Sequence, residues 1–158
     1  MFVFKAAVVG AGTMGGQIAQ TIAAAGIPVV LKDIDDALVQ AGLDEARNVT
    51  TGQIGKLAEK GKITAEQADE QIAQIVGRIH GTTSYAAFGD VDIVIEAVPE
   101  RMEIKQVVFS ELHEVTPGDI DAGIEAEKRA FATVFASEDA REGISAFLHK
   151  CPPRFQGK

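Results

Sequence analysis

Hydrophobic residues follow two patterns, which alternate along most of the chain. Four short apolar runs, at residues 2–9, 28–32, 78–83 and 91–95, predict strands, and the segments between them carry apolar side chains at helical spacing. Such alternation of strands and helices is typical of an α/β fold built around a parallel sheet. The expected order of the strands in that sheet is 3-2-1-4.

The helix after the first strand is marked by Met14, Ile18 and Ile22, which recur every fourth residue and predict an apolar stripe facing the core. Gly26 is expected to end this helix. The fourth strand, at residues 91–95, is apolar enough to be buried on both faces of the sheet. The helix that follows it is predicted to bury one side, which carries Ile104, Val107, Val108 and Leu112.

Two helices are predicted between the second and third strands, where a simple strand–helix–strand unit has one. Asp35 offers an N-cap for the first of them, although Gly52 and Gly55 weaken its helical pattern. The pair Thr64 and Gln67 forms a capping box for the second. We therefore expect a helical hairpin as extra structure, reaching beyond the sheet toward a substrate.

The character of the sequence changes at Asp119. No strand pattern follows, and two amphipathic helices are predicted, one over residues 124–135 and one capped by Ser137. We therefore expect two domains, a sheet domain over residues 1–118 and a helical tail over residues 119–158.

Three glycines join the first strand to its helix at fixed spacing. Gly10 allows a tight turn, Gly12 lets the backbone approach a pyrophosphate, and Gly15 lets the helix lie close to the strand. Free N–H groups at the start of the helix, which includes Thr13 and Met14, would bind the phosphates. A glycine-rich turn is by itself weak evidence, but here it lies between a predicted strand and a predicted helix.

An acidic residue follows the second strand at the position that a dinucleotide-binding unit requires. Asp33 lies about twenty residues beyond the glycines, where a carboxylate accepts hydrogen bonds from an adenosine ribose. A carboxylate there disfavours a 2′-phosphate, so NAD is the expected cofactor rather than NADP. The alternative is an ordinary strand–helix–strand unit in which Asp33 caps the next helix.

The composition narrows the class of partner. The chain has 158 residues and a formal net charge of -8 at pH 7, which argues against nucleic acid or an anionic membrane surface. No signal peptide and no membrane-spanning segment is predicted, so a cytoplasmic location is expected. Cys151 has no partner cysteine and is expected to be a free thiol, and the three histidines lack metal-ligand spacing.

Residues 3 to about 118 resemble the NAD-binding half of 3-hydroxyacyl-CoA dehydrogenases. The resemblance rests on four stretches, which read VGAGTMG from residue 9, KDI from residue 32, GKI from residue 61 and DIVIEAVPE from residue 92. It implies a Rossmann-like fold and the oxidation of 3-hydroxyacyl-CoA to 3-oxoacyl-CoA in fatty-acid β-oxidation. It also implies that Glu100 and Lys105 lie beside the cofactor and that the backbone of Ala97 and Val98 lines its ribose side.

The same resemblance implies contacts with a coenzyme A thioester. The helical hairpin corresponds to the part of these enzymes that touches coenzyme A, so Lys56, Lys60 and Lys62 are candidate contacts. The alternative is that these lysines form a solvated, charged helix end.

The tail resembles a different family. EKRAF from residue 127, SEDAREG from residue 137 and AFLHK from residue 146 resemble the C-terminal helices of enoyl-CoA hydratases of the crotonase family. The resemblance implies that the chain is a dehydrogenase–hydratase fusion with its middle deleted.

The catalytic motifs of the dehydrogenase family are missing after residue 118. Its members supply a catalytic His, an orienting Glu and an Asn there, so no catalytic residue is predicted in this chain. One hypothesis is a non-catalytic NAD-binding module, and a second is an enzyme fragment completed by another chain. A third is an internally deleted product with no selected role. The open edge expected beside the fourth strand favours a homodimer or a complementing chain.

Overall fold

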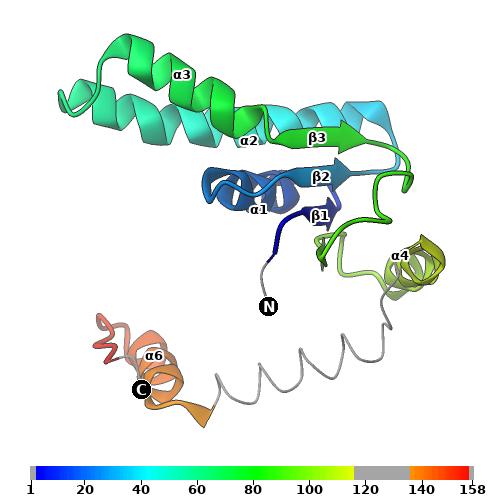
Figure 1. Cartoon of the computed structure of the whole chain (residues 1–158). Helices are drawn as coiled ribbons and strands as arrows, with labels where there is room; N and C mark the ends of the chain where they lie inside the picture. The colour runs from blue at the N-terminus through cyan, green and yellow to red at the C-terminus, as the bar shows by residue number, and fades with distance from the viewer. Residues whose placement is uncertain (1–2, 116–135, 157–158) are drawn as a thin grey trace. The chain divides into compact units, whose positions relative to one another are not determined.

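The computed structural model describes residues 3–115 and 136–156 (Figure 1). The chain divides into two compact units, Met1–Pro117 and Gly118–Lys158. The first unit contains the sheet and most of the helices, and the second contains one described helix.

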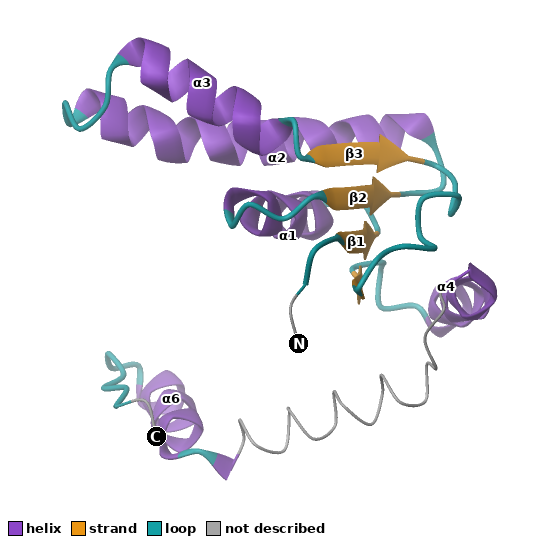
Figure 2. Ribbon diagram, in the orientation of Figure 1, coloured by secondary structure: helices purple, strands orange, loops and turns teal. Residues whose placement is uncertain are grey.

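A four-stranded parallel sheet forms the centre of the first unit (Figure 2). β1 pairs with β2 on one side and β4 on the other, and β2 pairs with β3, so the order is β3-β2-β1-β4 as predicted. Each strand is shorter than the apolar run that predicted it, and Phe4, ahead of β1, is 75% exposed. The strands are β1 (Ala6–Val9), β2 (Val29–Lys32), β3 (Ile79–Thr82) and β4 (Ile93–Glu96).

Four helices connect or follow these strands, and two of them form the predicted hairpin between β2 and β3 (Figure 1). The Asp35 side chain caps the first hairpin helix by accepting the N–H of Leu38 at 2.8 Å. Thr64 and Gln67 form the predicted capping box at the start of the second. The helices of this unit are α1 (Thr13–Ala24), α2 (Asp36–Glu59), α3 (Ala65–Val76) and α4 (Met102–Val115).

α2 continues through Gly52 and Gly55, where a weaker helix was expected. A methyl group at either position would meet nothing within 4 Å, so neither glycine is required by packing. α1 and α3 both pack along α2, and these tertiary contacts outweigh the low helix propensity of two glycines.

Two apolar clusters cover the two faces of the sheet. Ala19 of α1 and Ala46 of α2 share one buried cluster with Leu31 of β2. Val108 of α4 shares the other with Val9 of β1. The two faces are separated because successive side chains of a strand point to opposite sides.

The buried face of α1 differs from the predicted stripe. Gly15, Ala19 and Ala23 are buried, whereas Met14 is 69% exposed and Ile18 lies at the rim of the cluster. Small residues let the helix approach the sheet closely, so the larger side chains move to its flank. The prediction that Met14 faces the core is therefore wrong.

β4 is an edge strand, as the predicted order implies, but the prediction that both of its faces are buried is wrong. No strand within the described residues pairs with its outer side, and Ile93 is 45% exposed. α4 buries Val108 and Leu112 in the cluster that contains Val9, whereas Val107, which was predicted to be buried, is 57% exposed.

The second unit contains α6 (Glu138–His149). The predicted cap is present, because the Ser137 hydroxyl accepts the N–H of Ala140 at 3.0 Å. Cys151 follows this helix as an exposed free thiol. The helix expected over residues 124–135 and the predicted boundary at residue 118 lie outside the described residues.

Candidate functional site

The turn after β1 is held by close contacts between backbone atoms. Gly10 has a φ of +103°, and its N–H donates to the Lys32 carbonyl at 2.8 Å. A Cβ on Gly10 would lie 2.6 Å from the Ala97 carbonyl oxygen, and one on Gly15 would lie 1.7 Å from the Gly10 oxygen. No side chain fits at either position, so the turn, the start of α1 and the end of β4 share one tightly packed edge.

The start of α1 is open to a ligand. Gly12 is its N-cap residue, and no side chain caps the N-terminal N–H groups of this helix. A Cβ on Gly12 would meet nothing within 4 Å, and the first turn carries no acidic residue. Uncapped N–H donors and the positive end of the helix dipole fit an anionic group such as a pyrophosphate.

Asp33 lies beside this turn. Its Oδ2 accepts the N–H of Ala11 at 2.6 Å, and its Oδ1 accepts the N–H of Ile34 at 2.7 Å. The helix that follows is capped by Asp35, so the alternative in which Asp33 serves as its cap is wrong. The Asp33 carboxylate instead joins the end of β2 to the glycine turn.

The end of β4 carries a cluster of charged side chains. Lys105 Nζ lies 2.9 Å from Glu96 Oε2 and 3.0 Å from Glu100 Oε1. These two carboxylates, with Glu96 making the larger contribution, raise the pKa of Lys105. Glu96 Oε1 also accepts the N–H of Val98 at 2.7 Å, so one partly buried carboxylate holds both the ammonium group and the loop after β4.

The loop after β4 contacts the glycine turn directly. The Ala97 N–H donates to the Val9 carbonyl at 2.8 Å, and the Ala97 carbonyl lies against Gly10. The predicted residues Gly10, Asp33 and Ala97 therefore meet at the carboxyl edge of the sheet, and Val98, Glu100 and Lys105 are joined to them through Glu96.

The hairpin lysines lie elsewhere. α3 leads into the amino end of β3, so the turn between α2 and α3 lies about 18 Å beyond that end at a rise of about 1.5 Å per residue. Figure 1 shows this turn projecting past the amino ends of the strands. Lys56, Lys60 and Lys62 are at or near it, so the structure does not bring them to the glycine turn, and their contact with coenzyme A stays a prediction.

Sequence reasoning missed two residues of this edge. Glu96 was assigned only to the end of a strand, although its carboxylate accepts hydrogen bonds from both Val98 and Lys105. Gly42 was not singled out, yet a Cβ there would lie 2.5 Å from the Ala11 carbonyl oxygen. An isolated glycine inside a helical pattern was the available signal, since such a residue often has a packing reason.

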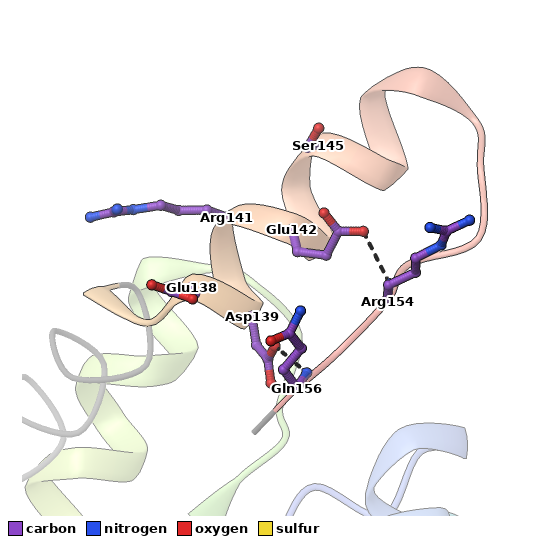
Figure 3. Close-up of a pocket in the computed structure, with 7 residues that line it drawn as sticks. All are labelled: Glu138, Asp139, Arg141, Glu142, Ser145, Arg154 and Gln156. Atoms are coloured by element: carbon purple, nitrogen blue, oxygen red, sulfur yellow. Dashed lines mark hydrogen bonds between the residues drawn. The ribbon is translucent and has the colours of Figure 1, made fainter. Parts of the chain in front are cut away.

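The second unit has an open hollow beside α6 (Figure 3). The Glu142 carboxylate accepts the N–H of Arg154 at 3.0 Å, and the Asp139 carboxylate accepts the N–H of Gln156 at 2.6 Å. These acidic groups hold the C-terminal segment on the helix, and they lie in a different unit from the glycine turn.

Within residues 3–115 and 136–156, no group of three or more His, Cys, Asp or Glu side chains could hold a metal ion. None of the helices described here is long and apolar enough to cross a bilayer.

Residues 5–120 match the family of the 3-hydroxyacyl-CoA dehydrogenase, NAD binding domain. The chain belongs to this family. It is 44% identical over 108 residues to the fatty acid oxidation complex subunit alpha of Pseudomonas entomophila, an alignment that covers 68% of this chain and 14% of that protein. The chain thus spans about a seventh of the length of the curated relatives it matches.

Solved structures agree with this assignment. The (S)-3-hydroxybutyryl-CoA dehydrogenase PaaH1 from Ralstonia eutropha is 35% identical with a TM-score of 0.61, and the match covers 73% of this chain and 38% of that one. The 3-hydroxybutyryl-CoA dehydrogenase from Escherichia coli K12 is 34% identical with a TM-score of 0.59, covering 74% and 23%. The predicted Rossmann-like α/β fold is confirmed, and NAD is the cofactor of this domain family.

Proposed function

We propose that this chain is the NAD-binding half of an enzyme that oxidises 3-hydroxyacyl-CoA to 3-oxoacyl-CoA, and that it is incomplete for turnover on its own. The observation that carries the proposal is the edge where the open start of α1, the Asp33 carboxylate and the Glu96–Lys105 pair meet. When bound, NAD supplies the nicotinamide carbon that takes the hydride from the substrate.

The residues of this edge have distinct roles in the proposal. The N–H groups at the start of α1 bind the pyrophosphate, which needs no side chain because these donors are uncapped. Asp33 accepts the hydroxyls of the adenosine ribose and repels a 2′-phosphate, so NAD is preferred over NADP. Lys105 and Glu100 lie toward the nicotinamide ribose, with Lys105 held in place by Glu96.

No histidine of this chain matches the family's acid–base His, which would accept the proton of the substrate hydroxyl. His80 lies in β3 and His149 in α6 of the second unit, and His113 lies in α4 eight residues beyond Lys105, about 12 Å at a rise of about 1.5 Å per residue. Removing a general acid–base group typically lowers a rate by about 10²–10⁴-fold. Loss of the surface that orients the substrate lowers it further.

The free side of β4 supports completion by another chain. Ile93 is 45% exposed on the edge strand itself, and Met14 of α1 and Phe109 of α4 are further exposed apolar side chains of this unit. An edge strand with apolar neighbours is a template for a further strand. We propose a complementing chain as its partner, with a homodimer as the alternative.

Other parts of the proposal rest on sequence. We infer that the hairpin lysines Lys56, Lys60 and Lys62 bind a coenzyme A thioester, and that the tail descends from the crotonase-like half of a fusion enzyme. A cytoplasmic location is also inferred, supported by the single cysteine, which excludes an intrachain disulfide.

The test measures binding and turnover separately. Calorimetry with NAD should show binding by the chain alone, and NADH production from 3-hydroxybutyryl-CoA should be negligible. Adding a separately expressed substrate domain should restore NADH production. NAD binding without restored turnover would favour a non-catalytic module, and absence of NAD binding would overturn the proposal.

A further inference from the structure

Gly42 lies within α2, far along the sequence from the glycine turn, yet it contacts that turn. A Cβ at this position would lie 2.5 Å from the Ala11 carbonyl oxygen, 2.8 Å from the Ala11 Cβ and 3.0 Å from a methyl group of Leu31. A side chain cannot come within 3 Å of a backbone oxygen unless one of them shifts. α2 therefore lies directly on the peptide between Ala11 and Gly12.

α1 meets α2 at the same place. A Cβ on Gly16, in the first turns of α1, would lie 2.6 Å from the Gly42 carbonyl oxygen. Next to this contact, the Gln17 side-chain amide donates to Glu45 Oε1 at 2.7 Å. Gly16 and Gly42 therefore face each other where the two helices meet, so a movement of α2 would displace the first turns of α1.

Ala11 is consequently held on two sides. Its N–H donates to Asp33 Oδ2 at 2.6 Å, and its carbonyl oxygen rests against Gly42. A methyl group on residue 42 would push the Ala11 carbonyl away or lift α2. Either movement displaces the N–H groups that follow Ala11 and distorts the hydrogen bond between the Ala11 N–H and Asp33.

We propose that Gly42 is a positioning residue of the NAD site, because its missing side chain lets α2 set the place of the Ala11–Gly12 peptide and, through Ala11, of the Asp33 carboxylate. This inference rests on the proposed NAD binding. It assigns to α2 a role in cofactor affinity that the glycine motif alone does not contain.

The chain offers two matched controls. Gly52 lies in the same helix with nothing within 4 Å, so G52A removes a glycine from α2 without a clash. Gly81 in β3 also packs against α2, where a Cβ would lie 2.5 Å from Val39 Cγ1 and 2.9 Å from Leu43 Cδ1. These neighbours are side chains away from the turn, so G81A crowds α2 without touching Ala11.

The experiment measures the dissociation constant for NAD by calorimetry and the melting temperature of each variant. G42A should bind NAD at least tenfold more weakly than the wild type. G52A should bind NAD unchanged with a higher melting temperature, and G81A should bind NAD unchanged with a lower one. A folded G42A variant that binds NAD within twofold of the wild type would overturn the proposal.

Two outcomes need separate treatment. If G42A does not fold, the triple variant G42A/G52A/G55A replaces it, because alanines at the two open positions add helix propensity. A triple variant that also fails to fold would overturn the proposal, since Gly42 would then be required by the fold rather than the site. If the wild-type chain does not bind NAD, the proposed function fails instead.

Discussion

Replacing Asp33 tests the assignment of the cofactor most directly. Its two carboxylate oxygens accept the N–H groups of Ala11 and Ile34, and each oxygen keeps a second lone pair for a ribose hydroxyl. Asp33→Ala removes every acceptor, whereas Asp33→Asn keeps the shape but offers one oxygen and no charge. Both variants should therefore bind NAD more weakly, with the alanine variant weaker than the asparagine variant.

The size of the effect follows from the kind of bond that is lost. Hydrogen bonds to a charged group contribute about 1.5–3 kcal/mol each. Since 1.4 kcal/mol corresponds to a factor of ten, loss of one such bond in Asp33→Ala should raise the dissociation constant for NAD by about 10- to 150-fold. Affinity for NADP should fall less, because the substitution also removes repulsion of the 2′-phosphate.

Asp35→Ala is the control for this experiment. Asp35 lies two residues away and caps α2 through the N–H of Leu38, so its loss should lower the free energy of unfolding by about 1 kcal/mol and leave NAD binding unchanged. Calorimetry with NAD and NADP, together with urea denaturation, separates the two effects. If Asp33→Ala binds NAD as tightly as the wild type, or if the wild type prefers NADP, the role given to Asp33 is wrong.

Three further predictions concern the rest of the first unit. Burial, with Glu111 nearby, raises the pKa of Tyr85, the only tyrosine, so its absorbance titration should lie above pH 10. Stability should fall as pH rises past about 10, where the unfolded tyrosine ionises, and Tyr85→Phe should reduce this decline. Thr64→Ala should lower the free energy of unfolding by about 1 kcal/mol in urea denaturation without changing NAD affinity, and an unchanged stability would contradict the capping box. Ile93→Lys should weaken binding of the complementing chain in sedimentation experiments, because a charge on an edge strand opposes pairing; equal binding would place the contact elsewhere.

The order of elements could be predicted because local signals mark it. Gly10 and Gly26 stand where the chain turns with positive φ, and the Thr64 capping box begins α3 as expected. The strand order was expected from the doubly wound arrangement, and right-handed crossovers then place the helices on either side of the reversal on opposite faces of the sheet.

Burial was harder to predict, because the apolar period of a helix does not state how closely that helix approaches its neighbour. Met14 and Ala19 are both apolar, but only the small side chain fits beneath α1, so Met14 is exposed. β4 has an apolar sequence typical of a central strand, yet Ile93 is exposed because the sheet ends there in the described residues. Contacts such as that of Gly42 with Ala11 join segments that are distant in the sequence, and the only sequence signal for this one is a glycine within a helical pattern.

The contacts that place the cofactor edge explain why binding and turnover should separate. Gly10 rests on Ala97, Ala11 is held by Asp33 and Gly42, and Val98 is held by Glu96. All of these residues belong to the first unit, and none of the contacts uses the open side of β4. The proposed NAD-binding surface is therefore assembled within this unit without a further strand, whereas the proposed function assigns the orientation of the substrate to a complementing chain. We accordingly expect a complementing chain to change turnover by orders of magnitude while changing the dissociation constant for NAD by less than about tenfold, a difference of 1.4 kcal/mol.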